Sequence, residues 1–236
     1  MSFPNFSDPQ RFYETSRPIV IGCYIVAFVL AVIGIYMGFF VTPIDYRQGN
    51  SYRIIFIHIP CAWMSLFTYL MMAFYTIWAL VTKSKMAPVF AVAMAPTGAI
   101  MGFIALFTGS MWGRPTWGTY WVWDARLTSM LILFFLYLGY IALHTAFDDW
   151  RKADRAAALN GPIIYFSVRW WNTLHQGASI TTHGTSMETT MFYTVLTMVA
   201  AMWIYCTGAI VRRARTVVLE RYRREPWARA AAAKEA

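Results

Sequence analysis

Long uncharged runs of apolar residues alternate with short polar segments along this chain. The first run, residues 19–41, holds 23 residues without a charge. At about 1.5 Å per helical residue it can cross the roughly 30 Å hydrocarbon core of a bilayer. Comparable runs lie at residues 58–81, 89–107, 127–147 and 189–211. The pattern therefore predicts membrane-spanning helices joined by short loops.

One more span is predicted less directly. Residues 161–168 are apolar, but a segment of membrane length has to cover residues 156–174 and include Arg169 and Asn172. The distribution of charge favours this span. With six crossings, 15 of the 20 Lys and Arg residues fall on one side, which the positive-inside rule assigns to the cytoplasm. A five-span chain would place the Arg-rich C-terminal segment outside, so we reject it.

We therefore expect an all-α integral membrane protein with six transmembrane helices and both termini in the cytoplasm. We expect residues 1–236 to form a single polytopic domain. Its parts outside the spans include a cytoplasmic arm (1–18), a Trp-rich outer loop (109–126) and a basic cytoplasmic tail (212–236). The composition agrees, because only 13% of the residues are charged against about a quarter in soluble domains. An aromatic content of 18% also excludes a disordered chain.

A net charge of +9 would suggest a nucleic-acid partner in a soluble protein. Seven of the basic residues, however, lie within residues 212–229, directly after the last apolar run. Arg side chains at that position meet anionic lipid headgroups. We therefore expect membrane lipid, and no nucleic acid, as the partner of this segment.

The predicted topology sorts the four histidines. His58, His175 and His183 fall on the outer side, whereas His144 falls at the cytoplasmic end of a span. A lone His at a helix end is commonly a hydrogen-bonded interfacial group, and a metal ligand is the alternative. Two imidazoles do not make a structural zinc site, which takes four protein ligands.

The outer loop is unusually aromatic. Residues 112–124 contain Trp112, Trp117, Tyr120, Trp121 and Trp123. An aromatic belt at headgroup depth is one interpretation, but the crowding of the rings into a single loop favours a flat binding platform. We expect residues 117–124 to form a short interfacial helix.

Such a platform suits a planar hydrophobic ligand with anionic arms, which Arg114 or Arg126 would pair with. Haem is a ligand of this kind, and its iron accepts imidazole. Asp124 is included in this candidate set, and we expect it to cap or orient the loop. The outer side offers no paired carboxylates for hydrolysis, and the chain has no GxxxxGK[ST] motif for ATP chemistry.

Three segments resemble a known family. WGRPTWGTYWVWDARLTS at residues 112–129 is similar to the tryptophan-rich WWD signature of haem-handling proteins in cytochrome c maturation. RIIFIHIPCAWMS at residues 53–65 and RWWNTLHQG at residues 169–177 narrow the resemblance to the CcmC family. Larger relatives with the signature, CcmF and the CcsA-type synthetases, carry additional spans that 236 residues do not accommodate.

The resemblance implies a protein that binds b-type, non-covalent haem at the periplasmic face of the inner membrane. It implies His58 and His175 as the axial iron ligands and the aromatic loop as the haem platform. Haem would pass to the chaperone CcmE, with CcmA, CcmB and CcmD as further membrane partners. The chain would be an assembly factor rather than a conventional enzyme. A haem transporter and, with less support, a b-type electron carrier are the alternatives.

Overall fold

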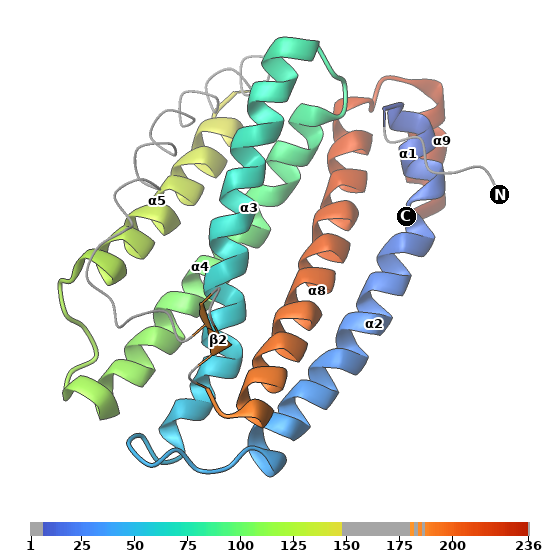
Figure 1. The fold of residues 1–236 in the computed structure, drawn as a ribbon. Helices are drawn as coiled ribbons and strands as arrows, with labels where there is room; N and C mark the ends of the chain where they lie inside the picture. Colours follow the sequence, from blue (N-terminus) through green and yellow to red (C-terminus); the bar gives the residue numbers. More distant parts are fainter. Residues whose placement is uncertain (1–6, 148–179, 182–183, 186, 236) are drawn as a thin grey trace.

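The computed structural model describes residues 7–147, 180–181, 184–185 and 187–235. Most of them are helical (Figure 1). The long helices are α2 (Arg17–Tyr36), α3 (Ile55–Thr82), α4 (Ala87–Trp117), α5 (Ala125–Thr145) and α8 (Thr189–Arg221). The short elements are α1 (Pro9–Thr15), the π-helix η1 (Met37–Val41), the 3₁₀-helix η2 (Ser51–Ile54), α9 (Pro226–Glu235) and the antiparallel strands β1 (Ile180–Thr181) and β2 (Gly184–Thr185).

Five stretches of the described chain are long and apolar enough to cross a membrane. They are Arg17–Val41, Ser51–Thr82, Ala87–Trp117, Arg126–Thr145 and Thr189–Arg221. These stretches match five of the predicted spans and confirm the mostly helical character. The remaining predicted span, residues 156–174, lies outside the described residues.

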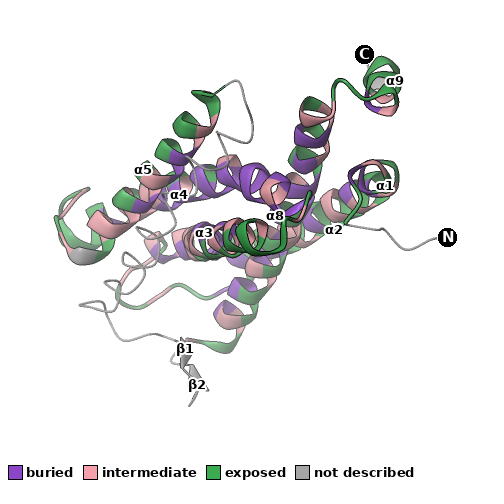
Figure 2. Cartoon of the chain, turned by 90° about the horizontal axis from the view of Figure 1, so that it is seen from above, coloured by how far each residue is buried: buried purple, intermediate pink, exposed green. Residues whose placement is uncertain are grey.

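Helix α4 is the centre of the bundle. It packs against α3, α5 and α8, and α2 packs against the other side of α8. Figure 2 shows the nearly continuous buried surface of α4. In contrast, apolar side chains at the periphery are strongly exposed, with Phe28 at 71%, Phe40 at 77% and Val81 at 76%. Such a surface is stable in lipid rather than in water.

Small residues allow the neighbours of α4 to approach it closely, as is common between helices in membranes. The ring of Tyr137 on α5 occupies the space where a side chain on Gly98 would lie. The Tyr137 hydroxyl donates a 2.7 Å hydrogen bond to the carbonyl of Ser65 on α3. The Ser65 hydroxyl in turn donates to the Gly98 carbonyl at 3.3 Å. Helices α3, α4 and α5 are thus held together in the bundle interior.

The two ends of the bundle differ. One end carries α1, α9 and the C-terminal ends of α3 and α5, and the other carries η2 and the start of α8 (Figure 1). Arg215 of α8 joins α1 to the first of these ends by donating to the Tyr13 carbonyl. Its guanidinium also lies 4.2 Å from the centre of the Tyr13 ring. The described N-terminal and C-terminal segments therefore lie at the same end.

Helices α5 and α8 run in the same direction, so the end of α5 and the start of α8 lie at opposite ends of the bundle (Figure 1). A chain with one more crossing between them requires this arrangement. The segment predicted to make that crossing is not among the described residues, and six spans remain a prediction.

The structure corrects several predicted boundaries. Helix α3 begins at Ile55, before the predicted start at residue 58, and Pro60 lies inside the helix. Helix α4 continues to Trp117, so the first part of the expected 109–126 loop is helical. Helix α8 likewise continues to Arg221, which makes the start of the expected tail part of the same helix.

The expected interfacial helix over residues 117–124 is wrong, because residues 118–124 are not helical. Gly118 has a φ of +80° and donates a 3.0 Å hydrogen bond to the carbonyl of Arg114. A glycine in this left-handed conformation ends a helix. The chain then runs as a loop until Asp124, which directly precedes α5 and caps it.

Candidate functional site

His58 is fixed between α3 and α4. Its Nδ1 atom lies 3.1 Å from the Thr108 hydroxyl oxygen, and Thr108 donates its own proton to the Ile104 carbonyl at 2.7 Å. Because that proton is already used, the Thr108 oxygen accepts a hydrogen bond from Nδ1–H. This favours the Nδ1–H tautomer, so the lone pair on Nε2 is the one available to a ligand.

A glycine makes room for this imidazole. A Cβ atom on Gly109 would lie 2.9 Å from Cε1 of His58, which is closer than two non-bonded carbon atoms approach each other. Trp112 lies on the same part of α4, and its ring meets that of His58 edge to face, with 5.8 Å between ring centres. Thr108, Gly109 and Trp112 thus form one face of α4 that receives His58.

The indole of Trp112 is itself held from a third segment. Its N–H donates a 2.7 Å hydrogen bond to Oε1 of Gln48. Gln48 lies in a turn in which Asp45 Oδ1 accepts the Gln48 backbone N–H at 2.7 Å. The turn before η2 therefore positions the aromatic ring that flanks His58.

The aromatic loop starts where α4 ends. The side chains of Trp117, Tyr120 and Trp123 are 45%, 50% and 77% exposed. Arg114 donates a 2.7 Å hydrogen bond to the Gly118 carbonyl, and its guanidinium lies 5.4 Å from the centre of the Tyr120 ring. The loop thus presents flat rings and a cation together on the surface.

Trp121 differs from the other rings of the loop. It packs edge to face against Trp123, with 5.4 Å between ring centres. Its indole nitrogen is buried but has no hydrogen-bond partner in the described part of the chain. Buried N–H groups are nearly always paired in folded proteins. This donor is therefore not used by any contact within the described part of the chain.

Asp124 has a clear structural role. Its Oδ1 accepts the backbone N–H of Leu127 at 2.7 Å, which caps the N-terminus of α5. Asp124 thus caps the helix that follows the loop, and a role for it in binding haem stays a prediction. Arg126 follows in the first turn of α5, is exposed, and lies close enough to His58 for their charges to interact. Arg114 and Arg126 are thus two exposed cations that belong to the same end of the bundle.

The structure places His58, Trp112 and the aromatic loop at one end of the bundle. His144 lies near the opposite end, with its ring stacked on Tyr140 at 6.5 Å between centres. His175 and His183 lie outside the described residues, so the predicted pair of ligands is described for one member only.

Thr108 and Gln48 position His58 and Trp112 but were not predicted from the sequence. The sequence does contain a signal for Thr108, since it precedes Trp112 by four residues and therefore shares its face on a helix. Gln48 had none, because the loop that carries it is separated from Trp112 by 64 positions.

Comparison with known proteins places this chain in a family. The family model described as "Heme exporter protein C" matches residues 2–229. The chain is 44% identical over 226 residues to "Heme exporter protein C" of Escherichia coli (strain K12), covering 93% of this chain and 91% of the relative. It is 42% identical over 229 residues to the protein of that name from Bradyrhizobium diazoefficiens, with 94% and 87% covered.

A relative from a plant extends the comparison. The "Putative cytochrome c biosynthesis ccmC-like mitochondrial protein" of Marchantia polymorpha is 43% identical over 195 residues, covering 82% of this chain and 85% of the relative. The family match spans nearly the whole chain and includes His58, His175 and the aromatic loop. The WWD-type signature at residues 112–129 thus lies within the part of the chain that the family model matches. This chain belongs to the CcmC family.

Proposed function

We propose that this protein holds haem at the periplasmic face of the inner membrane and passes it to the chaperone CcmE during cytochrome c maturation. One observation carries the proposal. The His58 imidazole is held through Nδ1 beside an aromatic surface, which leaves Nε2 as its ligating atom. The names of the relatives, which refer to haem export and cytochrome c biosynthesis, support haem as the cargo.

Each residue has a distinct role in this proposal. His58 supplies one axial ligand to the non-covalently held, b-type haem, and His175 supplies the other. Trp117, Tyr120, Trp121 and Trp123 form the apolar platform against which the porphyrin packs. The iron contributes its affinity for imidazole, and the protein contributes position, charge and exclusion of water.

The anionic arms of the porphyrin need partners of opposite charge. Arg114 and Arg126 are exposed at the same end of the bundle as His58, and Arg pairs strongly with carboxylates. The buried indole N–H of Trp121, which has no partner in the described residues, is a further donor. A haem held this way would remain accessible to an acceptor from the aqueous side.

The orientation in the membrane follows from charge. Lys83 and Lys85 lie in the turn between α3 and α4, at the end opposite His58, together with α1 and α9. The positive-inside rule assigns that end to the cytoplasm, so the His58 end faces the periplasm. In this arrangement CcmE receives haem outside, and CcmA, CcmB and CcmD act as membrane partners.

Absorption spectra of the purified full-length protein test the proposal. We expect a bis-imidazole haem spectrum that is lost or reshaped in His58→Ala and in His175→Ala. His144→Ala is the matched control, because it removes an imidazole at the opposite end. Spectra of both outer variants identical to that of the unmodified protein would overturn the ligand assignment.

Transport of haem across the bilayer is the second candidate, because the relatives are named exporters. Transport needs a polar or ligand-bearing path at mid-membrane depth. The described interior around Ser65, Gly98 and Tyr137 is instead closely packed, with their hydrogen bonds made to each other. Haem uptake into liposomes that contain only this protein would favour transport over surface binding.

A further inference from the structure

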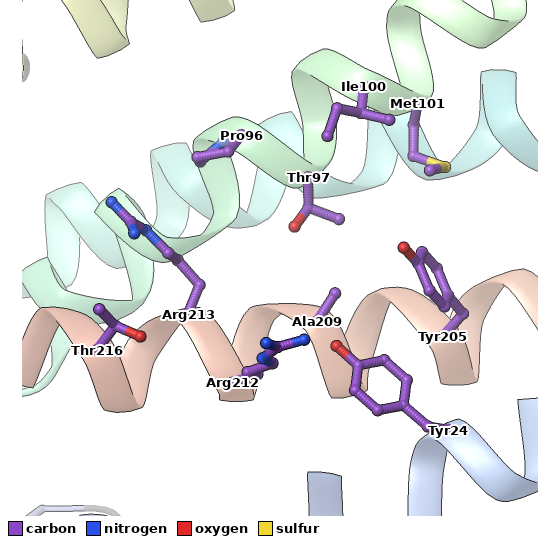
Figure 3. Close-up of a pocket in the computed structure, with 10 residues that line it drawn as sticks. All are labelled: Tyr24, Pro96, Thr97, Ile100, Met101, Tyr205, Ala209, Arg212, Arg213 and Thr216. Atoms are coloured by element: carbon purple, nitrogen blue, oxygen red, sulfur yellow. The ribbon is translucent and has the colours of Figure 1, made fainter. Parts of the chain in front are cut away.

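A cavity lies in the half of the bundle that is remote from His58. It has a volume of about 340 Å³ and lies between α2, α4 and α8 (Figure 3). Its lining residues are Tyr24, Pro96, Thr97, Ile100, Met101, Tyr205, Ala209, Arg212, Arg213 and Thr216. None of them belongs to the candidate haem site, so this cavity is independent of the proposed function.

The cavity has a polar part and an apolar part. Ile100, Met101 and Ala209 give it an apolar wall, whereas Arg212 and Arg213 provide two positive charges. Figure 3 shows the Arg212 guanidinium directed toward the hydroxyl of Tyr24. Among the ten lining residues none is acidic. The cavity thus combines apolar contacts with an excess of positive charge.

The two arginines have no partner of opposite charge in the described chain. The structure assigns neither of them an ion pair or a hydrogen bond among the described residues. Arg215, two positions further along α8, contrasts with them because it donates to the Tyr13 carbonyl and to the Ser16 hydroxyl. Arg215 therefore supports the fold, while Arg212 and Arg213 are available to an anion.

Their depth fits a lipid headgroup. Arg212 comes directly after the apolar run of α8, at the end of the bundle that carries α1 and α9. Tyr205 lies seven positions earlier on the same helix, which corresponds to about 10 Å along the axis. The cavity therefore extends from headgroup depth toward the acyl region, and exposed Ile100 continues it as an apolar surface.

We propose that this cavity binds the headgroup and glycerol region of an anionic phospholipid. The phosphate would pair with Arg212 and Arg213, and an acyl chain would lie along Ile100 and Met101. Basic pockets between membrane helices at the cytoplasmic side commonly bind anionic headgroups. The volume is at the small end of the roughly 300–1,000 Å³ typical of ligand sites, which suits a headgroup rather than a whole lipid.

Bound lipid would also join helices. The cavity is lined by residues of α2, α4 and α8, so an occupant contacts all three. A ligand that binds only the folded state raises its stability. We therefore expect phosphatidylglycerol to raise the melting temperature of the detergent-purified full-length protein, and phosphatidylcholine to have little effect.

Native mass spectrometry with titrated phosphatidylglycerol measures the binding directly. The double variant Arg212→Gln/Arg213→Gln is expected to bind about 25-fold more weakly, at about fivefold for each arginine removed. Arg223→Gln/Arg224→Gln is the matched control, because it removes two exposed charges from the same basic segment outside the cavity. This control is expected to bind like the unmodified protein.

A variant that keeps the charges guards against a folding defect. Ala209→Leu fills part of the cavity without removing an arginine, and it is expected to weaken phosphatidylglycerol binding as well. Equal binding of phosphatidylcholine by the unmodified protein would overturn the proposal. An equal loss of phosphatidylglycerol binding in the two double-arginine variants would also overturn it. So would a His58→Ala protein whose cavity retains haem in preference to lipid.

Discussion

The Nδ1 atom of His58 lies 3.1 Å from the hydroxyl oxygen of Thr108, which itself donates to the Ile104 carbonyl at 2.7 Å. This chain of two hydrogen bonds connects the imidazole on α3 to the backbone of α4. It fixes both the tautomer and the orientation of the ring. The proposed ligand is therefore prepared by the packing of two helices before any haem arrives.

Thr108→Val should weaken haem binding while preserving the shape of the side chain. Valine has no acceptor for the Nδ1 proton, so the ring loses its fixed tautomer and orientation. Loss of such a supporting hydrogen bond typically lowers the affinity of a metal site by about 10- to 100-fold. Haem titration of the detergent-purified protein, followed by absorbance, measures the change. Thr108→Ser keeps the hydroxyl and should bind nearly as the unmodified protein does; equal affinity of all three proteins would contradict the prediction.

Gly109→Ala should displace the imidazole sterically. The new Cβ would lie 2.9 Å from Cε1 of His58, and a ring held on both sides cannot yield without rotating away from Thr108. Overpacking of this kind costs about 1–3 kcal/mol. We expect reduced haem retention and an altered spectrum. Gly139→Ala on α5 is the control, because a Cβ there would meet nothing within 4 Å, and a haem spectrum equally altered in both variants would argue against a local effect.

Five of the predicted spans were predictable because they depend on long apolar runs, which the sequence displays directly. The end of α4 was less accessible, since residues 108–117 contain polar groups and Pro115 yet remain helical up to the left-handed Gly118. The predicted span began at residue 58, but α3 begins at Ile55. Tyr52, Ile55 and Phe56 belong to one buried hydrophobic cluster with Val195 on α8, and this packing stabilises the earlier start.

The candidate site was predictable in its residue types but not in its geometry. His58 and the aromatic loop carry recognisable chemistry, so the sequence identifies them without a structure. The hydrogen bond between His58 and Thr108, by contrast, joins positions 50 residues apart. It depends on how α3 and α4 are rotated about their axes, which only tertiary packing determines.

Gln48→Leu should loosen the indole that flanks His58. The substitution removes the acceptor of the 2.7 Å hydrogen bond from Trp112, and a hydrogen bond of this kind contributes about 1 kcal/mol. We expect a lower melting temperature and weaker haem retention. Trp112→Phe removes the donor of the same bond, so the double variant should be little worse than Trp112→Phe alone. Additive effects of the two changes would show that the residues act independently.

Glu188 should make the start of α8 sensitive to acid. Its carboxylate accepts the backbone N–H groups of Thr190 at 2.8 Å and Met191 at 3.0 Å. These hydrogen bonds favour the charged form, so the pKa of Glu188 lies below its usual value. A pKa lowered by folding adds stability above the ordinary value of about 4.3, and that stability is lost as the pH falls through the lower, folded value. Melting temperatures measured across that window should therefore fall more steeply for the unmodified protein than for Glu188→Gln. Glu220→Gln removes an exposed carboxylate from the other end of α8 and should retain the steep profile, so a profile flattened equally by both substitutions would exclude the cap as the source.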